Sequence, residues 1–192
     1  MSDTIHRAIE EYQTQYKPGI PEKSDLQPLI HRMLEQSGLR DVLSSQTIDI
    51  FWADPRVPIV GEIKLPKSGE FNPDPQTSKI PDWGYIKDRK QNKAARLHSR
   101  HQHGDGLAQL HMVMREEHAP YGIFTNGEKF FLHNHAPQFS ACCFANAPVE
   151  KRCGFPQQPP IYQCDLLADK VEKIAAVLEF LHKLWDEAQK TW

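Results

Sequence analysis

The stretch that most constrains the fold is VPIVGEIKLPKSG (residues 57–69), which begins as a buried β-strand and ends with ionised side chains. Side chains alternate between the two faces of a strand, so Glu62 and Lys64 are expected on the same face, with Ile63 between them. Ionised side chains are rarely buried unless they are paired or bind a metal, because removing them from water is costly. The end of this strand is therefore a candidate catalytic or metal-binding site.

A second carboxylate is expected beside the first. Asp49 lies in TIDIFWADP, the expected strand before this one, and a turn around residues 54–58 would place the two strands side by side. Two carboxylates and the backbone carbonyl of Ile63 would form an oxygen-rich site that suits Mg²⁺ or Mn²⁺. Lys64 would then orient or deprotonate a water, or stabilise a pentavalent phosphate. The alternative is a simple exposed ion pair between Glu62 and Lys64, worth about 0–1 kcal/mol.

The order of expected elements indicates one α/β domain over residues 1–192: a helix, three strands, helices, two strands and a helix. Residues 1–21 are expected to form an N-terminal helical extension. The next helix has a capping box at Ser24 and Gln27 and a stop signal at Gly38. Residues 66–104 are expected to form an inserted loop followed by a basic helix.

The second half of the chain has three expected parts. YGIFTNGEKFFLHNH predicts a hairpin with Asn126–Gly127 at its turn, a pair that accepts positive φ at both positions. Residues 136–163 are expected to be irregular, because they contain several prolines and no clear period. Apolar residues at helical spacing predict a C-terminal helix over residues 165–191.

The net charge of −2 provides no general attraction to nucleic acid, so a polyanion would need a local basic patch. Such a patch is present in residues 86–103, and its basic residues are Lys87, Arg89, Lys90, Lys93, Arg96 and Arg100. We expect these side chains to contact DNA phosphates; a solvated helix face is the alternative. No apolar run is long enough to cross a membrane and no apolar signal core begins the chain, so a cytoplasmic protein without a membrane partner is expected.

The four cysteines are Cys142, Cys143, Cys153 and Cys164, and their spacing contains no C-x-x-C. A zinc site with nearby histidines such as His133 is conceivable, but structural zinc sites usually have tighter paired spacing. Reduced thiols are the favoured interpretation.

These motifs together resemble the PD-(D/E)XK nuclease superfamily, and particularly the N-terminal endonuclease domain of the motor subunits of type I restriction enzymes. The matching segments, which cover roughly residues 25–133, are SDLQPLIHRMLEQSG, TIDIFWADP, VGEIKLP, LAQLHMVM and YGIFTNGEKFFLHN. The resemblance implies a restriction-endonuclease-like core, which is a central mixed β-sheet flanked by helices. It also implies Asp49 and Glu62 as Mg²⁺ ligands and Lys64 as the catalytic lysine.

Further positions follow from the same resemblance. Gln109 matches the glutamine of the family, although Val113 stands where a tyrosine is often found. An acid often present in the opening helix is matched best by Asp25, with Glu22 as the alternative, whereas Glu35 is expected to face away. No G-x-x-x-x-G-K-[ST] motif and no helicase motor follow, so a stand-alone domain is expected.

The function expected from these features is a metal-dependent DNA endonuclease that hydrolyses phosphodiester bonds in a restriction or DNA-processing role. Its partners would be DNA and other subunits of a restriction system or a helicase. The alternative is an inactive nuclease-fold module that binds DNA or a partner protein without cutting.

Overall fold

A computed structural model describes residues 2–20, 23–45, 48–54, 56–57, 59–66, 71, 106–117, 119–134 and 160–190. The helices of this part are α1 (Ser2–Gln15), α2 (Lys23–Gln36), α4 (Gly106–Glu116) and α6 (Val171–Lys190). Its strands are β1 (Val42–Leu43), β2 (Phe51–Trp52), β3 (Ile59–Ile63), β4 (Tyr121–Thr125), β5 (Lys129–Asn134) and β6 (Tyr162–Asp165). None of the helices in these ranges is long and apolar enough to cross a membrane.

A mixed sheet with the strand order β3-β4-β5-β6 forms the centre of the molecule. β3 runs parallel to β4, whereas β4–β5 and β5–β6 are antiparallel pairs. β1 and β2 form a separate antiparallel ribbon, and a bridge between Ile50 and Gly61 connects the residue before β2 to β3. The predicted mixed sheet flanked by helices is confirmed.

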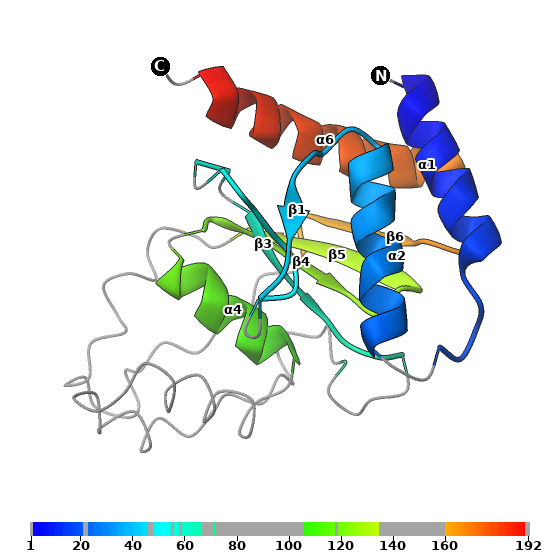
Figure 1. Cartoon of the computed structure of the whole chain (residues 1–192), viewed down its shortest axis with the longest axis horizontal. Coiled ribbons are helices and arrows are strands. Elements are labelled where there is room, and N and C mark those ends of the chain that lie inside the picture. Colours follow the sequence, from blue (N-terminus) through cyan, green and yellow to red (C-terminus); the bar gives the residue numbers. More distant parts are fainter. Residues whose placement is uncertain are drawn as a thin grey trace.

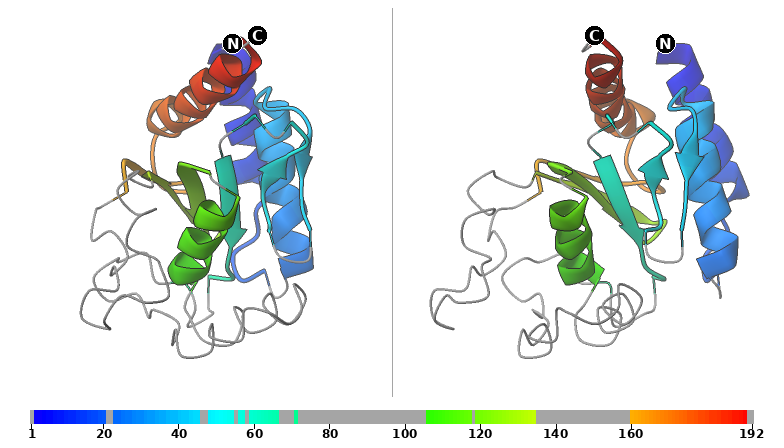
Figure 2. Two further views of the ribbon diagram at one scale, coloured as in Figure 1. Left: turned by 90° about the vertical axis from the view of Figure 1, so that its left-hand side faces the viewer. Right: turned by 60° about the vertical axis from the view of Figure 1, so that its left-hand side comes forward.

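Helices cover both sides of this sheet (Figure 1, Figure 2). α4 lies on one side, and α1, α2 and α6 lie on the other. Neighbouring residues of β4 divide between the two layers: Ile123 packs in the core beneath α1, α2 and α6, and Phe124 packs against α4. Val60 of β3 also belongs to the α4 layer. The alternation of side chains along β3 therefore places Glu62 and Lys64 on the side of α4.

The α2 helix buries the apolar stripe predicted from its spacing, at Leu26, Ile30, Met33 and Leu34. Its end is a Schellman motif: the Leu39 N–H bonds to the Leu34 carbonyl, the Gly38 N–H bonds to the Glu35 carbonyl, and Gly38 has a φ of +106°. The predicted stop is thus confirmed. The predicted capping box is wrong, because the helix begins at Lys23 and Ser24 lies within its first turn.

The β4–β5 hairpin is confirmed, but its turn differs from the expectation. Only Gly127 of the Asn126–Gly127 pair has positive φ, at +83°. The Asn126 side chain stays in the turn by accepting hydrogen bonds from the N–H groups of Glu128 and Lys129. A Cβ at Gly127 would lie 2.4 Å from Leu26 Cδ1, so the tip of the hairpin packs closely against α2.

The C-terminal part contains one strand more than predicted. Residues 162–165 form β6 beside β5, so the irregular segment does not extend to residue 163. The C-terminal helix begins at Val171 rather than at residue 165. The Asp165 carboxylate accepts hydrogen bonds from the N–H groups of Leu167 and Ala168. A side chain that bonds to the backbone two and three residues ahead favours a turn over a helix, which explains the later start.

Candidate active site

Two carboxylates meet because neighbouring chain segments lie side by side. Val57 N–H bonds to the Asp54 carbonyl, which closes the turn expected between β2 and β3. The Gly61 N–H then bonds to the Ile50 carbonyl at 2.7 Å, and the Gly61 carbonyl accepts from Ile50 at 3.2 Å. Asp49 directly precedes Ile50 in the chain, and Glu62 directly follows Gly61. This antiparallel bridge therefore brings the two acids to neighbouring positions. The two acids therefore converge as the hairpin argument predicted.

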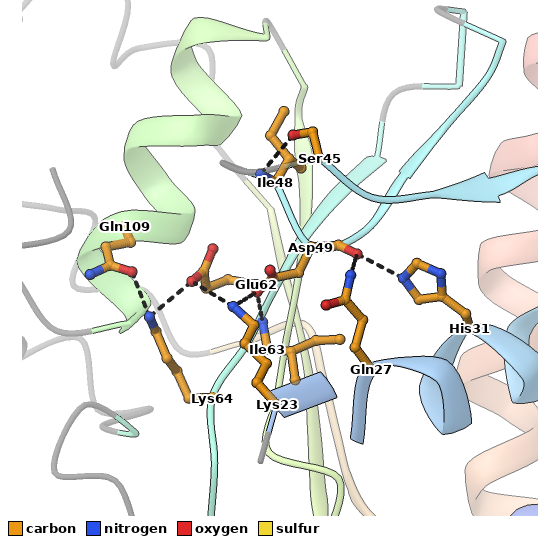
Figure 3. Close-up of polar contacts among 10 residues, drawn as sticks. All are labelled: Lys23, Gln27, His31, Ser45, Ile48, Asp49, Glu62, Ile63, Lys64 and Gln109. Carbon is orange, nitrogen blue, oxygen red and sulfur yellow. Dashed lines mark hydrogen bonds and ion pairs between the residues drawn. The ribbon is translucent and has the colours of Figure 1, made fainter. Parts of the chain in front are cut away.

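Asp49 is held by its side chain and by its backbone (Figure 3). Its Oδ2 accepts a hydrogen bond of 2.7 Å from the backbone N–H of Ile63, at the end of β3. Its carbonyl oxygen lies 3.2 Å from Gln27 Nε2 and 2.7 Å from His31 Nε2, both on α2. The side chain of Asp49 is only 10% exposed. Asp49 therefore has one fixed position between α2 and β3.

Glu62 is more deeply buried, with a side chain that is 3% exposed. Burial, together with the nearby charge of Asp49, raises its pKa to about 7, although Lys64 and Lys23 oppose the increase. Its Oε1 lies 3.0 Å from Lys64 Nζ. That contact is an ion pair without hydrogen-bond alignment, and none of the residues that the structure describes donates a hydrogen bond to Oε1. A cation in addition to Lys64 would thus be favourable here.

Lys64 lies at the end of β3 with a side chain that is 9% exposed. Besides its ion pair with Glu62, its Nζ donates a hydrogen bond of 2.6 Å to Gln109 Oε1 on α4. Gly106 makes room for the lysine, because a Cβ there would lie 2.6 Å from Lys64 Cγ and 2.8 Å from Phe124 Cε2. The close approach of the α4 N-terminus therefore encloses the ammonium group. The expected shared face of Glu62 and Lys64 is confirmed.

The fourth charged member of the site is Lys23, the first residue of α2. Its Nζ lies 2.5 Å from Asp49 Oδ2 and 3.9 Å from Glu62 Oε1. One face of α2 contacts Asp49 through three residues spaced by four positions: Lys23, Gln27 and His31 (Figure 3). Sequence reasoning missed this set. The signal is a polar stripe at helical spacing beside the apolar one.

The acidic pair has the donor chemistry of a site for a hard divalent cation. Asp49 and Glu62 supply carboxylate oxygens, which Mg²⁺ and Mn²⁺ prefer. Ile63 directs its N–H to Asp49, and the N–H and carbonyl of one strand residue point to the same side, so its carbonyl also faces this edge. The described ranges contain no cluster of three or more His, Cys, Asp or Glu side chains suited to a metal. A metal here would therefore need two side chains, backbone oxygen and water.

Asp25 is not part of this arrangement. It is an exposed residue in the first turn of α2. Residues two apart lie about 200° apart around a helix, so Asp25 points away from the side on which Lys23 reaches the acids. Glu35 is exposed, as expected. Glu22 lies outside the described residues.

Two other predictions fall mainly outside the described ranges. The basic segment, residues 86–103, lies entirely among the residues that are not described, as do Cys142, Cys143 and Cys153. Cys164 is a buried free thiol on β6, and burial raises its pKa to about 12. It pairs across the sheet with Phe130 and not with His133, which gives no support to a shared zinc site.

Comparison with known proteins provides no independent assignment. No family model matches the chain, no curated protein matches it, and no solved structure matches it.

Proposed function

We propose that this protein is a metal-dependent DNA endonuclease that hydrolyses phosphodiester bonds, built on a restriction-endonuclease-like core. The observation that carries the proposal is the convergence of Asp49, Glu62 and Lys64 at the bridge between neighbouring strands. All three side chains are at most 10% exposed, and the Lys64 ammonium lies 3.0 Å from Glu62. Buried charges in such an arrangement are costly unless they serve a task, and they are typical of catalytic sites.

Each residue has a definite part in this proposal. Asp49, Glu62 and the Ile63 carbonyl would hold Mg²⁺ or Mn²⁺, with waters completing the shell. The bound cation would supply Lewis-acid chemistry, lowering the pKa of a water and neutralising phosphate charge. Lys64 would keep a positive charge beside the phosphate that is attacked, where it stabilises developing negative charge. Gln109 would orient Lys64 through the 2.6 Å hydrogen bond.

The fold agrees with this proposal at a coarser level. A mixed sheet with helices on both sides and acids at adjacent strand segments is the arrangement implied by the resemblance to the PD-(D/E)XK superfamily. DNA affinity would come from residues 86–103, since the net charge of −2 leaves a local basic segment to supply the phosphate contacts. Other subunits of a restriction system or a helicase are the expected partners.

The decisive experiment is cleavage of supercoiled plasmid in Mg²⁺, in Mn²⁺ and in EDTA. We expect nicked or linear product only with a divalent cation. Asp49→Asn should abolish it, because the amide keeps the size of the side chain but removes its charge. Asp54→Asn is a matched control: Asp54 lies in the nearby turn and pairs with Arg56, away from the acidic pair. Cleavage that survives Asp49→Asn would assign the activity to another site or a contaminant.

The ion pairs of the site also favour a second candidate, a nuclease-fold module that binds DNA or a partner protein without cutting. Lys23 and Lys64 provide positive charge for both acids without any metal. In that case DNA binding by a gel-shift assay would be independent of Mg²⁺, and no DNA form would be cut.

A further inference from the structure

Lys23 extends from α2 toward both acids. Its ammonium nitrogen lies 2.5 Å from Asp49 Oδ2 and 3.9 Å from Glu62 Oε1 (Figure 3). It therefore approaches both carboxylates at once, as a bound cation would. The Glu62 oxygen that it approaches is the same Oε1 that no described residue supplies with a hydrogen bond.

The location of Lys23 in its own helix is unfavourable. It is the first residue of α2, where the helix dipole presents partial positive charge and favours acids over bases. Asp25, in the same first turn of α2, has the charge that this end of a helix favours. The attraction to Asp49 and Glu62 offsets this cost. The lysine is thus held by the acids and not by its helix.

Lys23 and Lys64 differ in how easily they can leave the acids. The side chain of Lys64 is 9% exposed and is enclosed by Gly106 and Gln109, whereas that of Lys23 is 38% exposed. A long, partly exposed lysine can rotate its ammonium into water while its aliphatic stem stays in place. Lys23 can therefore be displaced without opening the core, and Lys64 cannot.

We propose that Lys23 is a built-in counter-cation of Asp49 and Glu62, which stabilises the metal-free protein and which a divalent cation must displace in order to bind. This inference rests on the proposed function, since it assumes that the acids bind metal. It adds a residue that tunes the affinity of the site. Metal binding and the Lys23 ion pairs would compete, because a divalent cation and the Lys23 ammonium would both occupy the space between the two carboxylates.

The inference predicts two effects of opposite sign for one substitution. Lys23→Met keeps the length of the side chain and removes its charge. The metal-free variant should unfold at a lower temperature than wild type, because Asp49 and Glu62 lose a shared partner. Its affinity for Mn²⁺ should nevertheless rise, by about tenfold or more, because close like charges repel strongly at a partly buried site. A lysine with a merely structural role would weaken metal binding together with stability.

Calorimetric titration with Mn²⁺ and thermal unfolding in EDTA test both effects. Lys23→Arg should stay close to wild type in both measurements, because it keeps the charge. Lys170→Met is a matched control for the loss of one lysine at a helix start, since Lys170 directly precedes α6 and is exposed. That variant should leave Mn²⁺ affinity unchanged. Asp49→Asn shows whether the titrated ion is at this site.

Failure of the inference and failure of the proposed function give different results. Equal Asp49-dependent Mn²⁺ binding in wild type and Lys23→Met, or weaker binding in the variant, overturns the role of Lys23 and leaves the metal site intact. Binding by Lys23→Met alone supports the inference in its strongest form. Absence of Asp49-dependent binding in both proteins overturns the metal site itself, and the inference with it.

Discussion

Lys64 Nζ and Gln109 Oε1 form a 2.6 Å hydrogen bond that connects the end of β3 to α4. Both residues are buried, and the same Nζ lies 3.0 Å from Glu62 Oε1. One ammonium group therefore lies between an amide oxygen and a carboxylate oxygen from different elements. Such contacts fix a long side chain that would otherwise have several rotamers, so Gln109 is a positioning residue for Lys64.

The first prediction concerns this contact. Gln109→Leu removes the acceptor while keeping a side chain of similar size, so Lys64 should lose its fixed position. We expect the cleavage rate constant to fall by about tenfold or more, with metal affinity nearly unchanged. The free energy of unfolding should fall by about 1–3 kcal/mol, because a charged donor loses a buried partner.

Gln109→Glu separates positioning from stability. The carboxylate can accept from Lys64, so this variant should recover more activity than Gln109→Leu, with a changed pH profile from the added acid. Unchanged single-turnover cleavage in Gln109→Leu would show that the hydrogen bond only stabilises the fold.

A second prediction concerns Lys64 itself. Because Lys64 is 8% exposed, truncation to alanine would leave a cavity, so Lys64→Met, which keeps the length of the side chain, is the better test. Cleavage should fall by about 10² or more, the scale for losing one preorganised electrostatic or proton-transfer group. Mn²⁺ affinity should stay equal or rise, since an ammonium is not a ligand. Equal plasmid nicking by variant and wild type would remove Lys64 from the mechanism.

A third prediction concerns pH. In the metal-free protein burial raises the pKa of Glu62 to about 7, from an ordinary value of 4.5. Between these values the native state binds a proton that the unfolded chain does not, so stability from this group is present at low pH and is lost as pH rises through about 7. The loss should be about 1–3 kcal/mol.

Glu62→Gln isolates this effect. Urea unfolding in EDTA should show a free energy that falls from pH 5 to pH 8 more steeply in wild type than in Glu62→Gln. Buried His133, whose pKa is lowered to about 4, acts in the opposite direction below pH 6.5, but it is present in both proteins. Parallel curves for the two proteins would show that Glu62 titrates normally.

The sequence predicted those parts of the site that depend on local periodicity. Alternation along one strand was enough to place Glu62 and Lys64 on one face, and a short turn was enough to bring Asp49 beside them. These relations involve residues close in the chain, for which pleat and hairpin geometry leave few alternatives.

Relations between distant elements were harder to predict. The rotation of α2 about its own axis decides whether Lys23 or Asp25 reaches the acids, and tertiary packing sets that rotation. The expectation for Asp25 relied on its position in the chain and could not include the rotation of the helix. Strand β6 was missed because it lacks the alternation of a half-buried strand: Tyr162 and Gln163 are both exposed, and only Cys164 is buried. Its pairing with β5, rather than its own pattern, determines it.

A fourth prediction concerns the basic segment, residues 86–103. Reversing the charge of Lys93 and Arg96 should weaken DNA binding at low salt, because phosphate contacts release counterions. The slope of log affinity against log salt should become shallower by about one unit per lost contact. Fluorescence anisotropy across a salt series measures both quantities. Reversal of exposed Lys183 on α6 is the control for net charge, and an equal effect there would favour a solvated helix face.

The last prediction concerns Gly106, where α4 approaches β3. An alanine Cβ would lie 2.6 Å from Lys64 Cγ and 2.8 Å from Lys64 Cε. The same Cβ would lie 2.8 Å from Cε2 of the fully buried Phe124, so Gly106→Ala should lose about 1–3 kcal/mol of stability as well as displace the lysine. The displaced ammonium should lose its contact with Gln109, and cleavage should fall about as far as in Gln109→Leu, by roughly tenfold.

Gly122→Ala is the matched control for packing between α4 and the sheet. Its Cβ would lie 2.4 Å from Met114 Sδ, on the same interface but without contact to Lys64. We expect this variant to lose stability, since overpacking costs about 1–3 kcal/mol, and to keep its cleavage rate per folded molecule. Gly106→Ala should lose cleavage rate per folded molecule as well as stability, and single-turnover cleavage and thermal unfolding measure the two separately. If both variants lose rate and stability together, α4 acts as a general support of the sheet and the position of Lys64 is not what limits cleavage.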